Sequence, residues 1–485
     1  MHWIDLGIFI LYILAMLGVG LYFFRKNKSD DDYYVGGRNM SAGHVGLSVV
    51  ATDVGGGFSI GLGGLGFTMG LSGNWMLFTG LIGAWMSSAF LIPKVFGTAK
   101  KKGLLSFPQA LEHFYNPQVA LIAGIISLIG YIGFTSSQIL AGAKLASATF
   151  PALEISQGVL IMGIVAVVYT VIGGIKAVIY TDSIQWSILL IGLVGIGIPL
   201  GFLEIGGFEG LRKILKPEML SITNVSFVQL VNWAITIIPI WFVGMTLYQR
   251  IYACKDEKTA IKAWRIAGLF EWPVMAFMGV LLGLFAKVAL EQGMFVDLGF
   301  GPNTEIDAEM GLPLFLREML PIGLMGLMLS AYFSAIMSTA DSCLMAASGN
   351  FISDILGRFY PSSKSQIINS QIVTFVIGAL AVVLALSMEN VLELMLHSYA
   401  FMVSGLLIPV IGMLFIKKPS AKAAILAMVL GGGTTLTLIL LDTVLPFKLD
   451  PNFFGILTSA LTFMIVQQLD KSNSTKDGIF NPRSK

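Results

Sequence analysis

The feature that most limits how this chain can fold is a series of apolar segments, each about 20 residues long. Thirteen of them follow one another along the chain. A helix of this length crosses the hydrocarbon core of a bilayer. The sequence therefore predicts an all-α membrane protein with about 13 transmembrane helices, over residues 4–24, 43–70, 74–96, 118–148, 157–176, 182–205, 228–248, 266–290, 321–346, 367–388, 391–415, 422–442 and 452–469.

The composition excludes a soluble domain. Of the 485 residues, 55% are apolar and only 12% are charged, whereas soluble proteins are about a quarter charged. The net charge of +2 gives no reason to expect a nucleic-acid partner, and the two cysteines suggest no disulfide framework. The first segment lacks a preceding basic region and a small-residue cleavage site, so we interpret it as a retained helix. The lipid bilayer is thus the main partner that the composition predicts.

Basic residues orient the segments. If the N-terminus lies outside, the outer loops hold five basic residues, and most of the remaining Lys and Arg fall in inner loops and in the tail. Such an excess on one side marks the cytoplasmic face. The outer five are Arg212, Lys213, Lys216, Arg317 and Lys448. The chain is therefore predicted to be N-out and C-in, with Lys144 and Lys287 reaching toward the outer interface from their segments.

The second segment contains an acid beside a run of glycines. Residues 51–57 read ATDVGGG, and successive glycines favour an interrupted helix. An interrupted backbone at membrane depth lines a cavity or packs against protein, and its free carbonyls can bind a cation. Close helix packing also explains glycines. Asp53 either binds or senses a cation, or makes a structural hydrogen bond.

The ninth segment carries a row of hydroxyl groups. Ala335, Ser338, Thr339 and Ser342 recur at spacings of three and four residues, which places them on one helical face. Hydroxyl oxygens in a row suit a hard cation, although Ser and Thr also bond to carbonyls of their own helix. Asp341 in the same turn favours the cation.

A third element, residues 173–185, is predicted to be an inner turn that leads into a helix. Thr181 suits the start of that helix, and Asp182 suits the positive end of its dipole. This local role explains Asp182 as well as a role in transport does.

These pieces occur together in an order that resembles the sodium:solute symporter family. The resemblance rests on residues 34–38 (YVGGR), the broken segment at Asp53, the element 173–185, Gln249-Arg250, and Ser338-Thr339. It covers essentially the whole chain, and the ion-site motifs are closest to those of the sodium/proline symporter branch.

The resemblance implies a LeuT-type bundle with two inverted repeats of five helices. The repeats would be residues 43–205 and 228–415, within one transmembrane domain (1–469) whose peripheral helices are 4–24, 422–442 and 452–469. A short cytoplasmic tail (470–485) follows.

The resemblance also implies a set of ion-binding residues. The sodium ligands would be the carbonyls of Ala51, Val54 and Ala335 and the hydroxyls of Ser338 and Thr339. A second ion site or coupling site would use Asp53, Asp182, Asp341 and Ser342. Family members that transport sialic acid have serine where Asp341 stands, so this position departs from their pattern.

The substrate is less constrained. Sugar-binding members have glutamine where Phe58 stands, and the choline branch has tryptophan where Asp53 stands. The first departure argues against a sugar, and the second leaves a quaternary-ammonium cage incomplete. Trp241 and Met245, near Tyr248, suggest a small, partly apolar pocket. The residues predicted to line it are Phe58, Trp85, Tyr131, Gln138, Trp241, Met245 and Tyr399.

We therefore expect a multi-pass transporter of the cell membrane, in a bacterial inner membrane. It would import a small organic solute, such as an amino-acid-like zwitterion or a small carboxylate, together with sodium. Proton coupling, a quaternary-ammonium substrate, and a membrane sensor of the same fold remain alternatives. No catalytic grouping, nucleic-acid partner or obligatory protein partner is expected.

Overall fold

The computed structural model describes residues 2–24, 36–53, 55–150, 152–172, 175–302, 304–359 and 366–479. These residues are almost entirely helical and contain no β-sheet; a single isolated bridge pairs Met40 with Cys254. The predicted all-α class is confirmed.

The longer helices of the first half are α3 (Ala42–Asp53), α4 (Gly55–Met69), α5 (Trp75–Phe90), α8 (Pro117–Thr149), α9 (Ile155–Ile172) and α10 (Ile175–Gly192). Those of the second half are α13 (Phe227–Val243), α14 (Met245–Ala253), α15 (Glu257–Leu269), α16 (Ala276–Glu291), α18 (Leu324–Gly349), α20 (Gln366–Leu386) and α21 (Val391–Phe415). The remaining helices are α1 (Trp3–Phe24), α6 (Ile92–Lys102), α7 (Phe107–Phe114), α11 (Ile198–Glu204), α12 (Gly207–Ile214), α17 (Ala308–Met319), α19 (Gly357–Phe359), α22 (Ala421–Leu441) and α23 (Pro451–Ile479).

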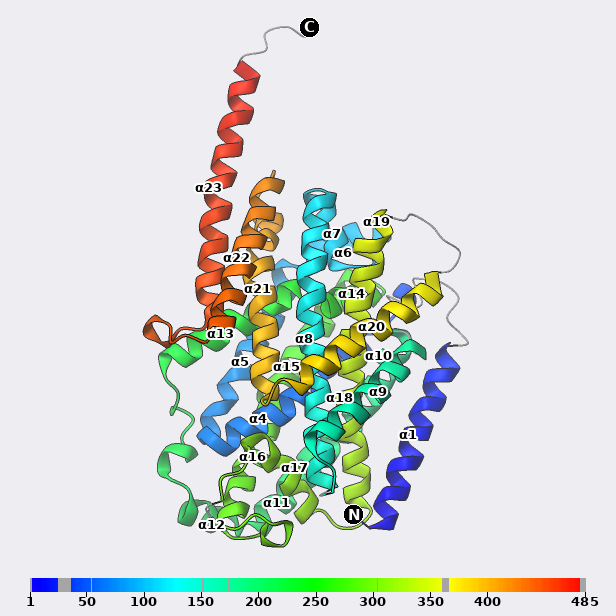
Figure 1. The fold of residues 1–485 in the computed structure, drawn as a ribbon, viewed down its shortest axis with the longest axis vertical. Coiled ribbons are helices and arrows are strands. Elements are labelled where there is room, and N and C mark those ends of the chain that lie inside the picture. Colours follow the sequence, from blue (N-terminus) through cyan, green and yellow to red (C-terminus); the bar gives the residue numbers. More distant parts are fainter. Residues whose placement is uncertain are drawn as a thin grey trace.

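Long helices form the centre of the bundle. Helix α8 packs along both α18 and α21, and α20 crosses them obliquely (Figure 1). Helix α1 lies at one edge of the bundle, and α22 and α23 lie at the other (Figure 1). Helix α1 begins at one end of the molecule, whereas α23 runs out at the opposite end, as an N-out and C-in chain requires (Figure 1).

Two helices are broken near their middle. The axis of α3 differs by 57° from that of the stretch Gly57–Phe90, which spans α4 and α5. The axes of α13 and α14 differ by 45° at Gly244. Each break lies in the first helix of one predicted repeat, at residues 43–70 and at residues 228–248. The glycine run therefore interrupts its helix, as predicted, and sequence reasoning missed the equivalent break at Gly244.

The count of 13 transmembrane helices is not confirmed. Among the described residues, seven helices are long and apolar enough to cross a membrane, or up to nine if each bent pair is one span. Three further apolar stretches are shorter: Trp3–Ala15, Ile155–Val168 and Gln371–Leu386. Breaks and gaps in the described chain divide several predicted segments into pieces that are too short to count.

Candidate functional site

The predicted sodium ligands meet where the end of α3 lies against the middle of α18. The Thr339 hydroxyl oxygen lies 2.9 Å from the Ala51 carbonyl oxygen and 3.0 Å from that of Ala335. The Ser338 hydroxyl oxygen lies 3.2 Å from the same Ala335 oxygen. Oxygens about 3 Å apart suit a hard cation whose ligands each lie about 2.3–2.6 Å away, as for Ca²⁺. The structure thus brings four of the five residues together.

The fifth residue, Val54, lies outside the described residues. The next residue, Gly55, has a φ angle of +53°, in the left-handed region that favours glycine. A Cβ atom at Gly55 would lie 2.8 Å from the Thr339 hydroxyl oxygen. Position 55 therefore favours glycine for two reasons. Its backbone is left-handed, and a larger side chain would collide with Thr339 beside the candidate sodium site.

Helix α8 stabilises both helix breaks with side chains two turns apart. The Gly57 amide of α4 donates to Gln138 Oε1 (3.0 Å), and the Thr246 amide of α14 donates to the Tyr131 hydroxyl (3.1 Å). The first amides of any helix have no partner within it. Tyr131 and Gln138 were predicted to contact substrate, and in the structure their polar atoms complete the two interrupted helices.

Two other predicted pocket residues lie together beside Asp53. The rings of Phe58 and Tyr399 have centroids 6.2 Å apart, and Tyr399 also packs edge-on against Phe134 at 4.9 Å. The Tyr399 side chain lies within hydrogen-bonding reach of Asp53. A buried aromatic cluster therefore adjoins the acid of the broken helix.

Sequence reasoning missed Glu271. It is fully buried in the short segment Phe270–Met275 between α15 and α16, and its carboxyl group lies within hydrogen-bonding reach of that of Asp53. The argument applied to Asp53, that an acid inside an apolar segment is functional by default, applies equally to Glu271 within residues 266–290.

Trp241 and Met245 flank the break at Gly244. Trp241 packs against Gly83 of α5, and its indole N–H is buried with no hydrogen-bond partner among the described residues. The Met245 sulfur accepts a hydrogen bond from the Phe107 amide at the start of α7 (3.2 Å). The Trp241 indole N–H is thus a donor left unsatisfied by the described part of the chain, whereas Met245 anchors the short helix α7.

Trp85 requires a correction. Its side chain is 47% exposed, packs against Gly268 of α15 and points its indole N–H toward the Arg265 carbonyl. Large aromatic side chains also suit the lipid-facing surface and its interfaces. We therefore remove Trp85 from the residues that line the pocket.

A buried arginine occupies the region of the predicted second ion site. Arg250 of α14 is fully buried, and its Nη2 lies 3.3 Å from Asp182 Oδ2 of α10. The same nitrogen donates to Ser342 of α18 (3.1 Å) and to Thr52 of α3 (2.5 Å), and Ser48 donates to Asp182 (2.6 Å). One guanidinium thereby joins four helices on one side of the sodium site.

Asp341 lies beside this network. Its Oδ1 accepts a hydrogen bond from Thr170 of α9 (2.6 Å), while its Oδ2 and Asp182 Oδ1 are buried with no hydrogen-bond partner among the described residues. Asp182, Asp341 and Ser342 therefore come together as predicted, but with Arg250 among them.

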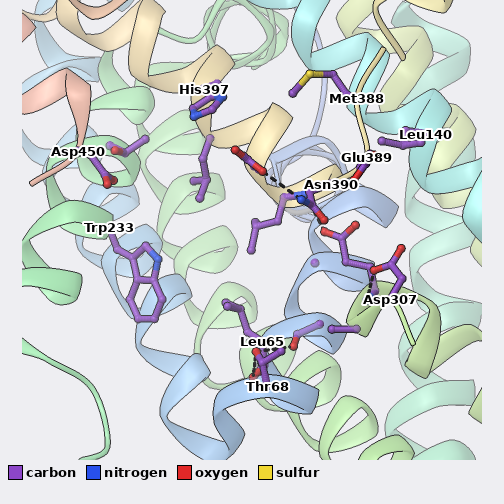
Figure 2. Close-up of a pocket in the computed structure, with 18 of the residues that line it drawn as sticks. Leu65, Thr68, Leu140, Trp233, Asp307, Met388, Glu389, Asn390, His397 and Asp450 are labelled. Atoms are coloured by element: carbon purple, nitrogen blue, oxygen red, sulfur yellow. Dashed lines mark hydrogen bonds between the residues drawn. The ribbon is translucent and has the colours of Figure 1, made fainter. Parts of the chain in front are cut away.

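A cavity of about 1000 Å³ lies on the other side of the site, between α4, α13, α21 and the segment before α17. Figure 2 shows Trp233, Asp307, Glu389, His397 and Asp450 around it. Burial raises the pKa of Asp450 to about 6. The cavity adjoins the predicted outer loops, so the buried Arg250 network closes the opposite, inner side.

Lys144 also requires a correction. It was predicted to reach the outer interface, yet it is 1% exposed and pairs with Asp307 (2.5 Å) and Glu309 (2.6 Å). Glu309 in turn accepts the Val391 and Leu392 amides at the start of α21, each at 2.9 Å. The lysine thus joins α8 to the outer loop and to α21. Lys287 is partly exposed and pairs with Glu291.

Broken helices around a candidate cation site, with a cavity on one side and a buried polar network on the other, are typical of a secondary transporter. The model of the sodium:solute symporter family matches residues 33–431. The chain belongs to this family and is a sodium-coupled solute symporter, not an enzyme.

The relatives differ in the solute that they are named for. The chain is 27% identical over 484 residues to the osmoregulated proline transporter OpuE of Bacillus subtilis, covering 95% of this chain and 94% of the relative. It is 26% identical to a sodium/glucose cotransporter of Vibrio parahaemolyticus, covering 98% and 92%. A sodium-coupled sialic acid symporter structure superposes with a TM-score of 0.78 at 22% identity, covering 96% and 98%. The LeuT-type fold is thus confirmed, and sequence identity alone does not select the solute.

Proposed function

We propose that the chain imports an amino-acid-like zwitterion or a small carboxylate with sodium across a bacterial inner membrane, in the predicted N-out and C-in orientation. Sodium is bound by the carbonyls of Ala51, Val54 and Ala335 and by the hydroxyls of Ser338 and Thr339. The repeats are residues 43–205 and 228–415.

One observation carries the sodium site. The Thr339 hydroxyl lies within 3.0 Å of carbonyls on both α3 and α18. A hydroxyl can donate only one hydrogen, so it bonds one carbonyl at a time. A cation in the same place binds all of these oxygens at once and holds α3 against α18.

Coupling follows from this position. Helix α3 belongs to a broken pair and α18 to the central helices, so sodium favours the arrangement in which they meet. The solute and the ion then increase each other's affinity by the same factor. Across about 100 mV, each charge that enters releases about 2.3 kcal/mol, enough to concentrate a solute about fiftyfold.

The substrate class is supported by the surroundings of the break. The cluster of Phe58, Phe134 and Tyr399 is apolar and buried, which suits a compact solute better than a sugar with many hydroxyls. The relative OpuE is described as a proline transporter. A second cation near Asp182 and Asp341 is supported by their two unpartnered oxygens.

The test is uptake into proteoliposomes with sodium or potassium outside. L-proline, glycine, propionate, choline and glucose are each offered as labelled solutes. Uptake of L-proline, glycine or propionate that needs sodium supports the proposal. Uptake that is indifferent to sodium but driven by a pH gradient contradicts it, as does sodium-driven uptake of glucose or choline alone.

A further inference from the structure

We infer that Asp53 and Glu271 together bind a positively charged amino group of the solute that carries N–H hydrogens. This inference rests on the proposed function and narrows its substrate class from zwitterions and carboxylates to N–H-bearing amines. It excludes quaternary ammonium compounds, carboxylates without an amine, and sugars.

The two acids face each other from different parts of the bundle. Asp53 ends α3 at the helix break, and Glu271 lies in the irregular segment between α15 and α16. Asp53 is 6% exposed and Glu271 is 0% exposed. Their carboxyl groups lie within hydrogen-bonding reach of each other, so both contribute oxygens to one small volume.

Glu271 lacks hydrogen-bond donors among the described residues. Neither oxygen of Glu271 meets a donor on the described part of the chain, and ionised carboxylates only accept hydrogen bonds. The Tyr399 side chain lies within hydrogen-bonding reach of Asp53, but the Glu271 oxygens remain without a donor from the described chain. A proton shared between the two carboxyl groups would satisfy one oxygen on each, but the second Glu271 oxygen would still lack a donor. Buried polar groups are almost always satisfied, so this oxygen indicates a donor that the described part of the chain does not provide.

Positive charge is also missing next to the two acids, as far as the described side chains show. Of the Lys and Arg side chains that the structure describes, two are buried, Lys144 and Arg250. Lys144 pairs with Asp307 and Glu309, and Arg250 pairs with Asp182. Asp53 and Glu271 are thus available to bind a cation that enters from outside.

An ammonium group supplies both the charge and the donors. A secondary ammonium has two N–H groups and a primary ammonium has three, enough to reach both carboxyl groups. A quaternary ammonium has none and would leave Glu271 unsatisfied. The neighbouring rings of Tyr399 and Phe58 offer apolar contacts for the carbon skeleton of the solute.

The position also explains coupling to sodium. Asp53 is two residues from Ala51, whose carbonyl contributes to the candidate sodium site. A solute on Asp53 and an ion on Ala51 both stabilise the same end of α3, so each favours the arrangement that binds the other.

The experiment compares two matched pairs of solutes in proteoliposomes with sodium outside. L-proline is compared with N,N-dimethylproline, and glycine with its trimethylated analogue, glycine betaine. Each pair keeps its carboxylate and its positive charge and differs in the N–H groups. The inference expects sodium-driven uptake of the members with N–H and at least about tenfold weaker competition by the methylated members.

Glu271→Gln then tests the acid directly. It keeps the size of the side chain and removes the charge, so we expect the half-saturating concentration of the transported amine to rise at least about tenfold. Sodium binding measured without solute should stay within about twofold of wild type, which also shows that the variant folds. Gly80→Ala is a second variant, because its Cβ atom would overlap the Glu271 carboxyl group, and it should weaken amine uptake in the same way.

The outcomes separate the two proposals. Sodium-driven uptake of a methylated analogue as good as that of its parent overturns the inference and leaves symport intact. An unchanged affinity for the amine in both Glu271→Gln and Gly80→Ala also overturns the inference and leaves symport intact. Failure of every amine and carboxylate to enter with sodium overturns the proposed function and this inference together.

Discussion

Loss of the Arg250 guanidinium should open the inner side of the protein. Arg250 and Asp182 are both fully buried, and the guanidinium joins α14 to α3, α10 and α18. In Arg250→Gln, Asp182 keeps Ser48 as a donor but loses its charged partner. Such contacts exist only while these helices meet, so their loss disfavours the inner-closed arrangement.

The magnitude follows from burial. Removing one member of a buried ion pair costs about 3–5 kcal/mol, and each 1.4 kcal/mol is about a factor of ten in an equilibrium. The inner-closed arrangement should therefore lose at least about a hundredfold in population relative to an inner-open one, in which water can reach Asp182.

Cys343 provides the assay. The chain has two cysteines, Cys254 and Cys343, and both are buried. Cys343 lies in α18 beside the Arg250 network. In a Cys254→Ser background, the labelling rate of Cys343 by a small membrane-permeant maleimide should rise at least about tenfold in Arg250→Gln, and sodium should slow it.

A matched control separates charge from volume. Asp182→Asn removes no volume yet leaves Arg250 without its charged partner, so it should also increase labelling. The double variant Arg250→Gln/Asp182→Asn leaves no uncompensated charge and should label more slowly than either single variant, because paired residues are not additive. Equal labelling in wild type and all three variants would refute the view that this pair closes the inner side.

The remaining predictions concern the two other contacts that organise the site. Gly55→Ala should weaken sodium binding at least about tenfold, because the new Cβ would lie 2.8 Å from the Thr339 hydroxyl and the backbone has a φ of +53°. Gly43→Ala is the control, because a Cβ there meets nothing within 4 Å. Equal sodium affinities of the two variants would contradict the reasoning. Lys144→Met should lower the midpoint of thermal unfolding, because it leaves Glu309 buried without its cation. An unchanged midpoint would mean that the Glu309 contacts to the α21 amides suffice.

The sequence predicted the parts of the site that are unusual for a membrane segment. Asp53, Ser338 and Thr339 stand out because polar groups at membrane depth are costly and rarely lack a role. The glycine run beside Asp53 indicated the first helix break for a similar reason. These inferences needed only the local sequence.

Contacts between distant segments were not predictable in the same way. Lys144 lies 165 residues from Glu309, and Arg250 lies 68 residues from Asp182. A lysine near a segment end is expected to reach the interface unless an acid from another loop meets it. Trp85 was placed in the substrate pocket for a related reason. No local pattern in a nearly uniform apolar helix distinguishes its lipid-facing side from its buried side.

Solute-driven sodium entry tests the central claim most directly. Radioactive sodium uptake into proteoliposomes is measured with and without the transported solute, for wild type and for Ser338→Ala/Thr339→Ala. The account predicts that solute accelerates sodium entry in wild type and has no effect in the variant, since two of the proposed ligands are missing. Acceleration of equal size in both proteins would contradict a sodium site between α3 and α18.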